Sequence, residues 1–273
     1  MIETSKVDSK VLNTSIFVFD IDGVIRDVSG SYRRALADTV EHFTEHSTEN
    51  FTKVAYRPTP EEIDELKAEG IWNNDWEASQ ELIKRYFQSL GKEIQVSYEA
   101  IVEFFQRRYR GSNSDWSDGY IATEPLIAST EYFQELTIAG IGWGFFSGAT
   151  RASASYVLRR LDINEPVLIA MEDAAGKPDP TGLLLAAKQI EMKQGHAATV
   201  IVYVGDTVAD MLTVVKARDY DPSYQYVAVG VIPPHVSVDL RDRYTALLKE
   251  NGADIVLSSV LELTPQINLL QDI

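Results

Sequence analysis

The chain of 273 residues contains no cysteine, which excludes disulfide bonds, thiolate metal sites and cysteine nucleophiles together. It is also short of positive charge, because 25 lysines and arginines stand against 41 aspartates and glutamates, and the formal net charge is −16. Such a surface repels nucleic-acid phosphates and anionic lipids at long range. We therefore expect neither a nucleic acid nor a membrane as a partner.

Long hydrophobic runs are absent as well. No segment approaches the roughly 18 apolar residues that suggest a membrane span, and the N-terminal segment lacks the basic and apolar pattern of a signal peptide. These absences predict a soluble, cytoplasmic protein, with a plastid protein that has lost its transit peptide as the alternative. The hydrophobic fraction of 45% is sufficient for a real core, and the length fits one large or two modest domains.

Short apolar runs alternate with longer helical patterns along the chain. Six of these runs indicate strands, because they are nearly continuous in apolar residues, as in a parallel sheet that is covered on both faces. They are Ile16–Asp20, Gly142–Ser147, Val167–Met171, Val200–Gly205, Tyr226–Val231 and Asp254–Leu257. Helical patterns lie between most of them, so the sequence predicts an α/β fold with a Rossmann-like parallel sheet.

One stretch interrupts this alternation, because residues 28–119 contain no convincing strand pattern. Apolar side chains recur there at helical spacing around Leu82–Leu90 and Ile101–Tyr109, and Pro60 marks a helix start. We expect a small helical bundle inserted between the first and second strands. The predicted domains are a catalytic core of residues 1–27 and 120–273 and an all-helical cap of residues 28–119.

The first motif with chemical content follows the first strand, where Asp20 and Asp22 precede Gly23. Ligands of open α/β sheets bind at the carboxyl ends of the strands. Two carboxylates this close repel each other unless a cation or a shared proton intervenes. An ordinary polar turn after a core strand has the same pattern, so this motif alone leaves both interpretations open.

A second acidic pair, Asp206 and Asp210, follows the apolar strand Val200–Gly205. If a helix begins near Thr207, Asp210 lies about one turn along the same side as Asp206. The pair is typical of a metal site. It fits equally well an Asp206 that caps the helix and an Asp210 that interacts with the helix dipole.

Two further motifs carry groups that bind anions. Ser147 and Gly148 follow a strand and precede a helix, where a hydroxyl and backbone N–H groups form an anion site; an ordinary serine N-cap is the alternative. Lys177 lies beside two prolines that fix its loop, although most lysines are solvated. Each motif is weak alone. Their joint order, with every motif after a strand end, is the strong observation.

Together these four motifs, over residues 16–210, resemble those of the haloacid dehalogenase superfamily. The helical insert resembles the cap of the C1 class in its subfamily IA. Two segments, Phe146–Ala149 and Gly176–Gly182, are similar to an uncharacterised subgroup from cyanobacteria, plants and archaea. The resemblance implies a hydrolase that depends on Mg²⁺ and removes phosphate from a small phosphorylated metabolite.

The resemblance also assigns roles by position. Asp20 matches the nucleophile that forms an aspartyl-phosphate, Asp22 the general acid and base, and Lys177 the cation that bridges nucleophile and phosphate. Phosphate binding is expected at Ser147, Gly148 and Gly23. The expected ligands of the magnesium ion are Asp20, the backbone carbonyl of Asp22, Asp206 and Asp210, the last directly or through water.

Several alternatives remain at this point. The presence of Asp22 favours phosphate esters over halides as substrates, because an alkoxide leaving group needs a proton and a halide does not. A phosphosugar mutase carries the same acids and is the nearest rival; a non-catalytic binding protein on the same fold is a further one. The sequence does not choose among phosphoglycolate, sugar phosphates and histidinol phosphate, nor between a monomer and a homodimer.

The insert is expected to select the substrate, and its most suggestive segment is 71–76. Trp72, Asn73, Asn74 and Asp75 offer an indole N–H, amides and a carboxylate, and Arg26 near the first motif is a further candidate for an anionic substrate. The same segment also fits a helix start, capped by Asn or Asp, with tryptophans in the core.

Overall fold

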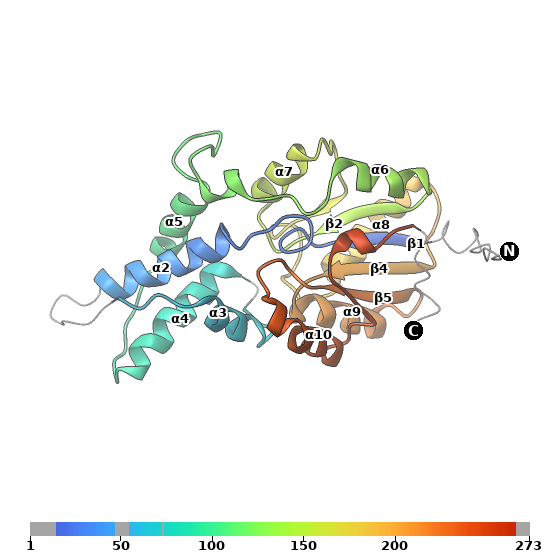
Figure 1. The fold of residues 1–273 in the computed structure, drawn as a ribbon. Helices are drawn as coiled ribbons and strands as arrows, with labels where there is room; N and C mark the ends of the chain where they lie inside the picture. Colours follow the sequence, from blue (N-terminus) through green and yellow to red (C-terminus); the bar gives the residue numbers. More distant parts are fainter. Residues whose placement is uncertain (1–14, 47–54, 73, 266–273) are drawn as a thin grey trace. The chain divides into compact units, whose positions relative to one another are not determined.

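The computed structural model describes residues 15–46, 55–72 and 74–265. Six parallel strands form one sheet in the order β3-β2-β1-β4-β5-β6 (Figure 1). The strands are β1 Ser15–Phe19, β2 Gly142–Phe146, β3 Leu168–Ile169, β4 Val200–Gly205, β5 Gln225–Val231 and β6 Ile255–Leu257. Each of the six predicted strands is present, with ends that differ by at most two residues. The predicted α/β sheet is therefore confirmed.

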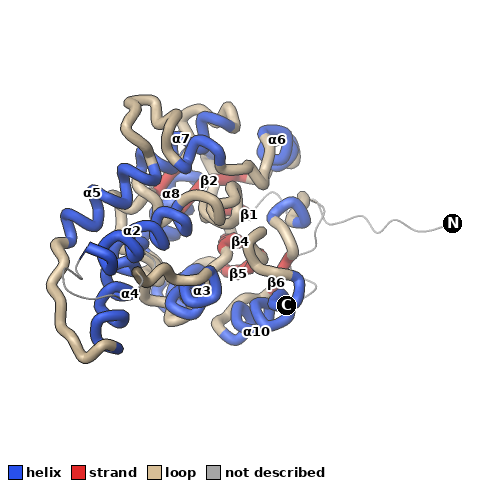
Figure 2. Tube along the Cα trace, turned by 60° about the vertical axis from the view of Figure 1, so that its left-hand side comes forward, coloured by secondary structure: helices blue, strands red, loops and turns tan. Residues whose placement is uncertain are grey.

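Both faces of this sheet are covered by helices, which explains why its strands are apolar throughout. On β1, Phe17 and Phe19 join one buried cluster, whereas Ile16 and Val18 join the other. Figure 2 shows the strands between the core helices. The first face packs against α6 Thr130–Ile138 and α7 Arg151–Arg160, and the second against α8 Thr181–Gln194, α9 Val208–Tyr220 and α10 Arg241–Glu250.

β1 lies at the point where the order of the strands reverses. The chain adds β2 and β3 on one side of β1 and then crosses to add β4, β5 and β6 on the other. In register, Phe19 lies beside Phe145 of β2 and Val204 of β4. The residues that follow β1, β2 and β4 therefore meet at one edge, where open α/β sheets bind their ligands.

The chain divides into two compact units, a core of residues 1–27 and 126–273 and a helical unit of residues 28–125. The described part of the helical unit has no strand. Its helices are α2 Tyr32–His46, α3 Pro60–Lys67, α4 Asp75–Ser89 and α5 Tyr98–Tyr109. A capping box of Thr59 and Glu62 starts α3 at Pro60, as the sequence predicts. None of the described helices in either unit is long and apolar enough to cross a membrane.

Residues 120–125 lie with the helical unit, whereas the sequence pattern placed them in the core. They contain a short 3₁₀ turn, Tyr120–Thr123. The hydroxyl of Tyr120 donates to Asp38 of α2 at 2.7 Å, and Ser31 donates to buried Glu124. These side-chain contacts join residues that are far apart in the sequence, so no local sequence pattern predicts them.

Candidate active site

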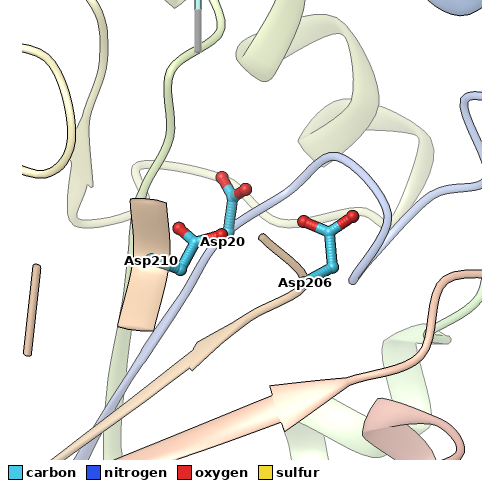
Figure 3. Close-up of side chains that lie close together, drawn as sticks. All are labelled: Asp20, Asp206 and Asp210. Carbon is cyan, nitrogen blue, oxygen red and sulfur yellow. The ribbon is translucent and has the colours of Figure 1, made fainter. Parts of the chain in front are cut away.

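Three motif residues follow three neighbouring strands of the core. Asp20 comes after β1, Ser147 after β2 and Asp206 after β4. The backbone N–H of Asp20 donates to Val204 at 2.8 Å, which extends the pairing of β1 and β4 up to the first acid. Carboxylate oxygens of Asp20, Asp206 and Asp210 all lie within 4.8 Å of one another (Figure 3). The two acidic motifs thus meet in one buried cluster.

Lys177 is the cation of this cluster. Its Nζ lies 2.9 Å from Oδ1 of Asp20 and 2.7 Å from Oδ1 of Asp210. The ammonium also lies over the rings of Phe146 and Tyr203, with 5.2 and 5.4 Å to the ring centres, an arrangement that favours a cation. Burial lowers the pKa of Lys177, but the two carboxylates outweigh burial and raise it, so the side chain stays charged.

The acids carry more negative charge than Lys177 neutralises. Burial raises the pKa of Asp20 to about 7; Lys177 opposes this rise, whereas Asp210 and Asp22 add to it. Burial, Asp210 and Asp20 also raise the pKa of Asp206 well above its ordinary value. Buried carboxyl groups with raised pKa values ionise readily only when a further cation is present.

Asp206 has the properties expected of a ligand for that cation. It is buried, and no hydrogen-bond donor of the described residues reaches its carboxylate. Gly23, at φ 75°, allows the close approach, because a Cβ there would lie 2.0 Å from Oδ2 of Asp206. The negative charges of Asp20 and Asp206 are not fully neutralised by Lys177. Two such carboxylates close together suit a hard divalent cation, which prefers oxygen ligands.

Asp210 is held differently from the other two acids. Its Oδ1 accepts from Tyr203 at 2.9 Å besides contacting Lys177, and its Oδ2 accepts from the backbone N–H and the hydroxyl of Thr207 at 2.9 and 2.6 Å. These four contacts match the acceptor capacity of a carboxylate. Burial raises the pKa of Asp210, but Lys177 and then Thr207 lower it below the ordinary value. Asp210 therefore fixes Lys177.

The N-terminus of α9 differs from the alternative interpretation of its sequence. Its N-cap is Thr207, in a capping box with Asp210, and not Asp206. Asp206 is consequently available for a ligand. The sequence patterns did not identify Tyr203, whose hydroxyl donates to Asp210. A tyrosine inside an otherwise apolar strand, on the face that α9 covers, is the signal that could have indicated it.

The loop after β2 carries the expected anion-binding groups. Ser147 is buried, and its hydroxyl accepts from the N–H of Ala149 at 3.2 Å. The N-cap of α7 is Thr150, so the interpretation of Ser147 as an ordinary N-cap was wrong. Gly148 lies between Ser147 and that helix start, where backbone N–H groups attract anions. Phosphate binding by this loop remains a prediction.

The comparison with protein families bears directly on these motifs. The family model of the haloacid dehalogenase-like hydrolases matches residues 14–218, which include every motif described above. The chain belongs to this family.

One relative and two solved structures similar to this haloacid dehalogenase-like hydrolase have identities of 20–30%. An imidazoleglycerol-phosphate dehydratase from Phytophthora nicotianae is 30% identical over 92% of the chain, and the chain spans 52% of that relative. A hydrolase from Pseudomonas syringae has a TM-score of 0.60 at 20% identity, with 91% of this chain and 95% of that chain covered. Phosphatase Tt82 from Thermococcus thioreducens has a TM-score of 0.56 at 21% identity, with 84% and 98% covered. The two solved structures share the fold.

Asp22, the expected acid and base of the hydrolase, is close enough to Asp20 and Asp206 for its charge to raise the pKa of each, and it is paired with Arg26. Its side chain is 23% exposed, whereas that of Arg26 is fully buried. The guanidinium contacts Oδ1 of Asp22 at 2.6 Å. Substrate contact by Arg26 stays a prediction, and its guanidinium contacts Asp22.

The candidate substrate segment has structural partners in the helical unit. Asn74 caps α4 by accepting from the N–H of Trp76 at 3.0 Å, which confirms the predicted helix start. Asp75 pairs with Lys67 at 2.6 Å, and Trp72 donates to Glu69 at 2.6 Å. Asn73 lies outside the described residues. Substrate contact by this segment stays a prediction.

The cap on α4 allows its structural role to be separated from substrate contact. Asn74→Ala is expected to lower the free energy of unfolding by about 1 kcal/mol, because two N–H groups lose their acceptor. Asn74→Ser, which keeps a capping oxygen, should restore most of that loss, and a purely structural role predicts that both variants retain kcat/KM. Urea denaturation and steady-state kinetics check this. A large fall in kcat/KM for the stable serine variant would instead indicate that the amide contacts substrate.

The pKa of Asp20 predicts an unusual dependence of stability on pH. Its folded-state pKa of about 7 exceeds the ordinary 3.8, so the folded state binds more protons than the unfolded state between these values. The free energy of unfolding of the metal-free protein should therefore fall as pH rises through that interval. Denaturation at several pH values checks this, with Asp20→Asn as the control that should reduce the slope, the remainder coming from the raised pKa of Asp206. A stability that rises over the same interval in the wild type would contradict it.

Proposed function

We propose that this hydrolase is a magnesium-dependent phosphatase that cleaves a small phosphate monoester through an aspartyl-phosphate on Asp20. The observation that supports this most strongly is the convergence of Asp20, Lys177 and Asp206 from three separate segments of the chain. A carboxylate nucleophile divides hydrolysis into two easier steps. Phosphoryl transfer otherwise requires mainly positioning and neutralisation of negative charge.

In the first step, a carboxylate oxygen of Asp20 attacks phosphorus while the bond from phosphorus to the ester oxygen breaks. Lys177 contacts Asp20 and holds its positive charge beside the transferring group. Ser147 and the N–H of Gly148 bind phosphate oxygens. The N–H of Gly23, the third group expected to bind phosphate, donates in this structure to the carbonyl of Arg26 at 2.9 Å. Asp22 donates a proton to the departing alkoxide, which is otherwise a poor leaving group.

In the second step, water attacks phosphorus and the bond to Asp20 breaks. Asp22, now ionised, accepts the proton from that water, and inorganic phosphate leaves. A magnesium ion, held by Asp20, Asp206 and the backbone carbonyl of Asp22, would supply further neutralisation of the phosphate oxygens. Asp210 keeps Lys177 in place and would help to hold the ion, directly or through water.

The substrate class follows from the need for a phosphate monoester and from one relative. The Phytophthora nicotianae protein is named for a phosphorylated imidazole glycerol. Because the chain spans about half of that protein, the named activity can reside in the other half, and the hydrolase half would act on a related ester. We therefore place imidazole-bearing phosphate esters such as histidinol phosphate first among the substrates to test.

A phosphate-release screen tests this proposal. Phosphoglycolate, sugar phosphates and histidinol phosphate are supplied with magnesium, and release is compared between the wild type and Asp20→Asn. Release by the wild type alone supports a phosphatase. Conversion of a sugar bisphosphate to its isomer without release would indicate a mutase, and no turnover of any ester would indicate a binding protein; both results would overturn the proposal.

A further inference from the structure

Arg26 is a fully buried arginine in the loop that carries the expected acid and base. Two of its nitrogens, Nε and Nη2, each lie 2.6 Å from the same oxygen, Oδ1 of Asp22. Neither of these contacts uses Oδ2 of Asp22. The pair is four residues apart but does not lie on a helix, so its geometry comes from the loop.

Backbone contacts hold this loop closed. The N–H of Gly23 donates to the carbonyl of Arg26 at 2.9 Å, and the N–H of Ile25 donates to Ile21 at 2.8 Å. Arg26 also forms a bridge with Leu126, and Ile127 donates to Ile25 at 2.8 Å. The backbone of Arg26 is thus fixed relative to Asp22 by core residues alone.

The ion pair with Asp22 does not by itself make an arginine at this position favourable for stability. Removing a guanidinium from water is unfavourable by several kcal/mol, and an apolar side chain in place of a buried ion pair is often neutral or stabilising. Asp22 is partly exposed, so water would solvate its charge without Arg26. In addition, Arg26 fixes the orientation of the Asp22 carboxylate, because a planar guanidinium restrains the carboxylate that it contacts.

We infer that Arg26 is the positioning residue of Asp22, which it holds through Oδ1 so that Oδ2 faces the reacting oxygen. This inference rests on the proposed phosphatase function. In the first step, a bond forms between a carboxylate oxygen of Asp20 and phosphorus, the bond from phosphorus to the ester oxygen breaks, and the proton on Oδ2 of Asp22 passes to that ester oxygen. In the second step, a proton from water returns to Oδ2 as the water–phosphorus bond forms and the Asp20–phosphorus bond breaks. Oδ1 keeps its contacts with Arg26 in both steps.

Leaving-group dependence separates positioning from a structural role. An alkyl phosphate needs a proton on its leaving oxygen, whereas p-nitrophenyl phosphate hardly needs one. We expect Arg26→Met to slow the first step with an alkyl phosphate by on the order of 10²-fold, and with p-nitrophenyl phosphate far less. Single-turnover kinetics with magnesium measure the rate of that step. In steady-state kinetics, the KM of Arg26→Met should change little. Arg26→Lys should recover part of the loss, and Asp22→Asn should show the same preference for the aryl ester.

Arg218→Met is the matched control, because it removes an ion pair of the core, with Asp254, away from the site. It should leave the ratio of the two rates unchanged. An equal loss for both esters in a stably folded Arg26→Met, or no loss, would overturn the inference. Thermal denaturation measures the folding of both Arg26 variants, and the ratio of the two rates in Arg26→Lys decides if Arg26→Met does not fold. If wild-type activity requires Asp20 but not Arg26, this inference fails alone. If the wild type turns over neither ester, the proposed function fails with it.

Discussion

Replacing Asp20 with asparagine is expected to reduce phosphate release by on the order of 10⁴-fold, because an amide does not form the acyl phosphate. The variant should still fold. Burial raises the pKa of Asp20, so a neutral side chain of the same shape relieves an unfavourable buried charge. Lys177 also keeps Asp210 as a partner at 2.7 Å. Steady-state kinetics with saturating magnesium and the preferred ester measure the loss.

Asp242→Asn provides the matched control for this experiment. Asp242 is an exposed acid of α10 in the same core, so its replacement changes the net charge equally and leaves the site intact. Its activity should equal that of the wild type. A variant Asp20→Asn that folds and retains activity within about tenfold of the control would exclude Asp20 as the nucleophile.

The second large effect is expected at Asp206, where stability and activity should change in opposite directions. Asp206→Asn removes a buried carboxylate that Asp210 and Asp20 repel and that receives no hydrogen bond from the described residues. Above the raised pKa, the metal-free variant should be more stable than the wild type, because the neutral amide removes an unfavourable buried charge. Its activity should fall by on the order of 10²-fold or more, because a metal ligand is lost.

Magnesium distinguishes this explanation from a simple gain in packing. At a concentration about 100-fold above its Kd, magnesium should stabilise the wild type by about 2.7 kcal/mol. Asp206→Asn should gain much less. Urea denaturation with magnesium and with a chelator measures both differences. Equal stabilisation of the two proteins would show that the ion binds elsewhere.

Much of the site follows from sequence because its residues stand at strand ends. Parallel strands bring their carboxyl ends together whatever the intervening segments are, so Asp20, Ser147 and Asp206 converge once the strand order is known. Lys177 was predictable only from its place in the order of motifs. Nothing local shows that its ammonium lies between two carboxylates.

The remaining features depend on packing that no local pattern reveals. Spacing alone left open whether Asp206 or another residue caps α9; the structure gives that role to Thr207. The pairing of Arg26 with Asp22 depends on a loop that Gly23 closes at positive φ, so spacing along a helix would not have identified it. The polar segment around Asn74 is a case in which residue types alone were ambiguous. Its residues are suited to substrate contact, and in the structure they begin helix α4.

The most direct test of covalent catalysis by Asp20 is to trap the phosphorylated enzyme. Protein that is turning over a phosphate monoester with magnesium is quenched in acid and reduced with borohydride, which converts an acyl phosphate into homoserine, and its peptides are sequenced by mass spectrometry. An aspartyl-phosphate mechanism predicts homoserine at position 20 and nowhere else, and none in Asp20→Asn. Full turnover with an unmodified Asp20, or with homoserine at another aspartate, would contradict it.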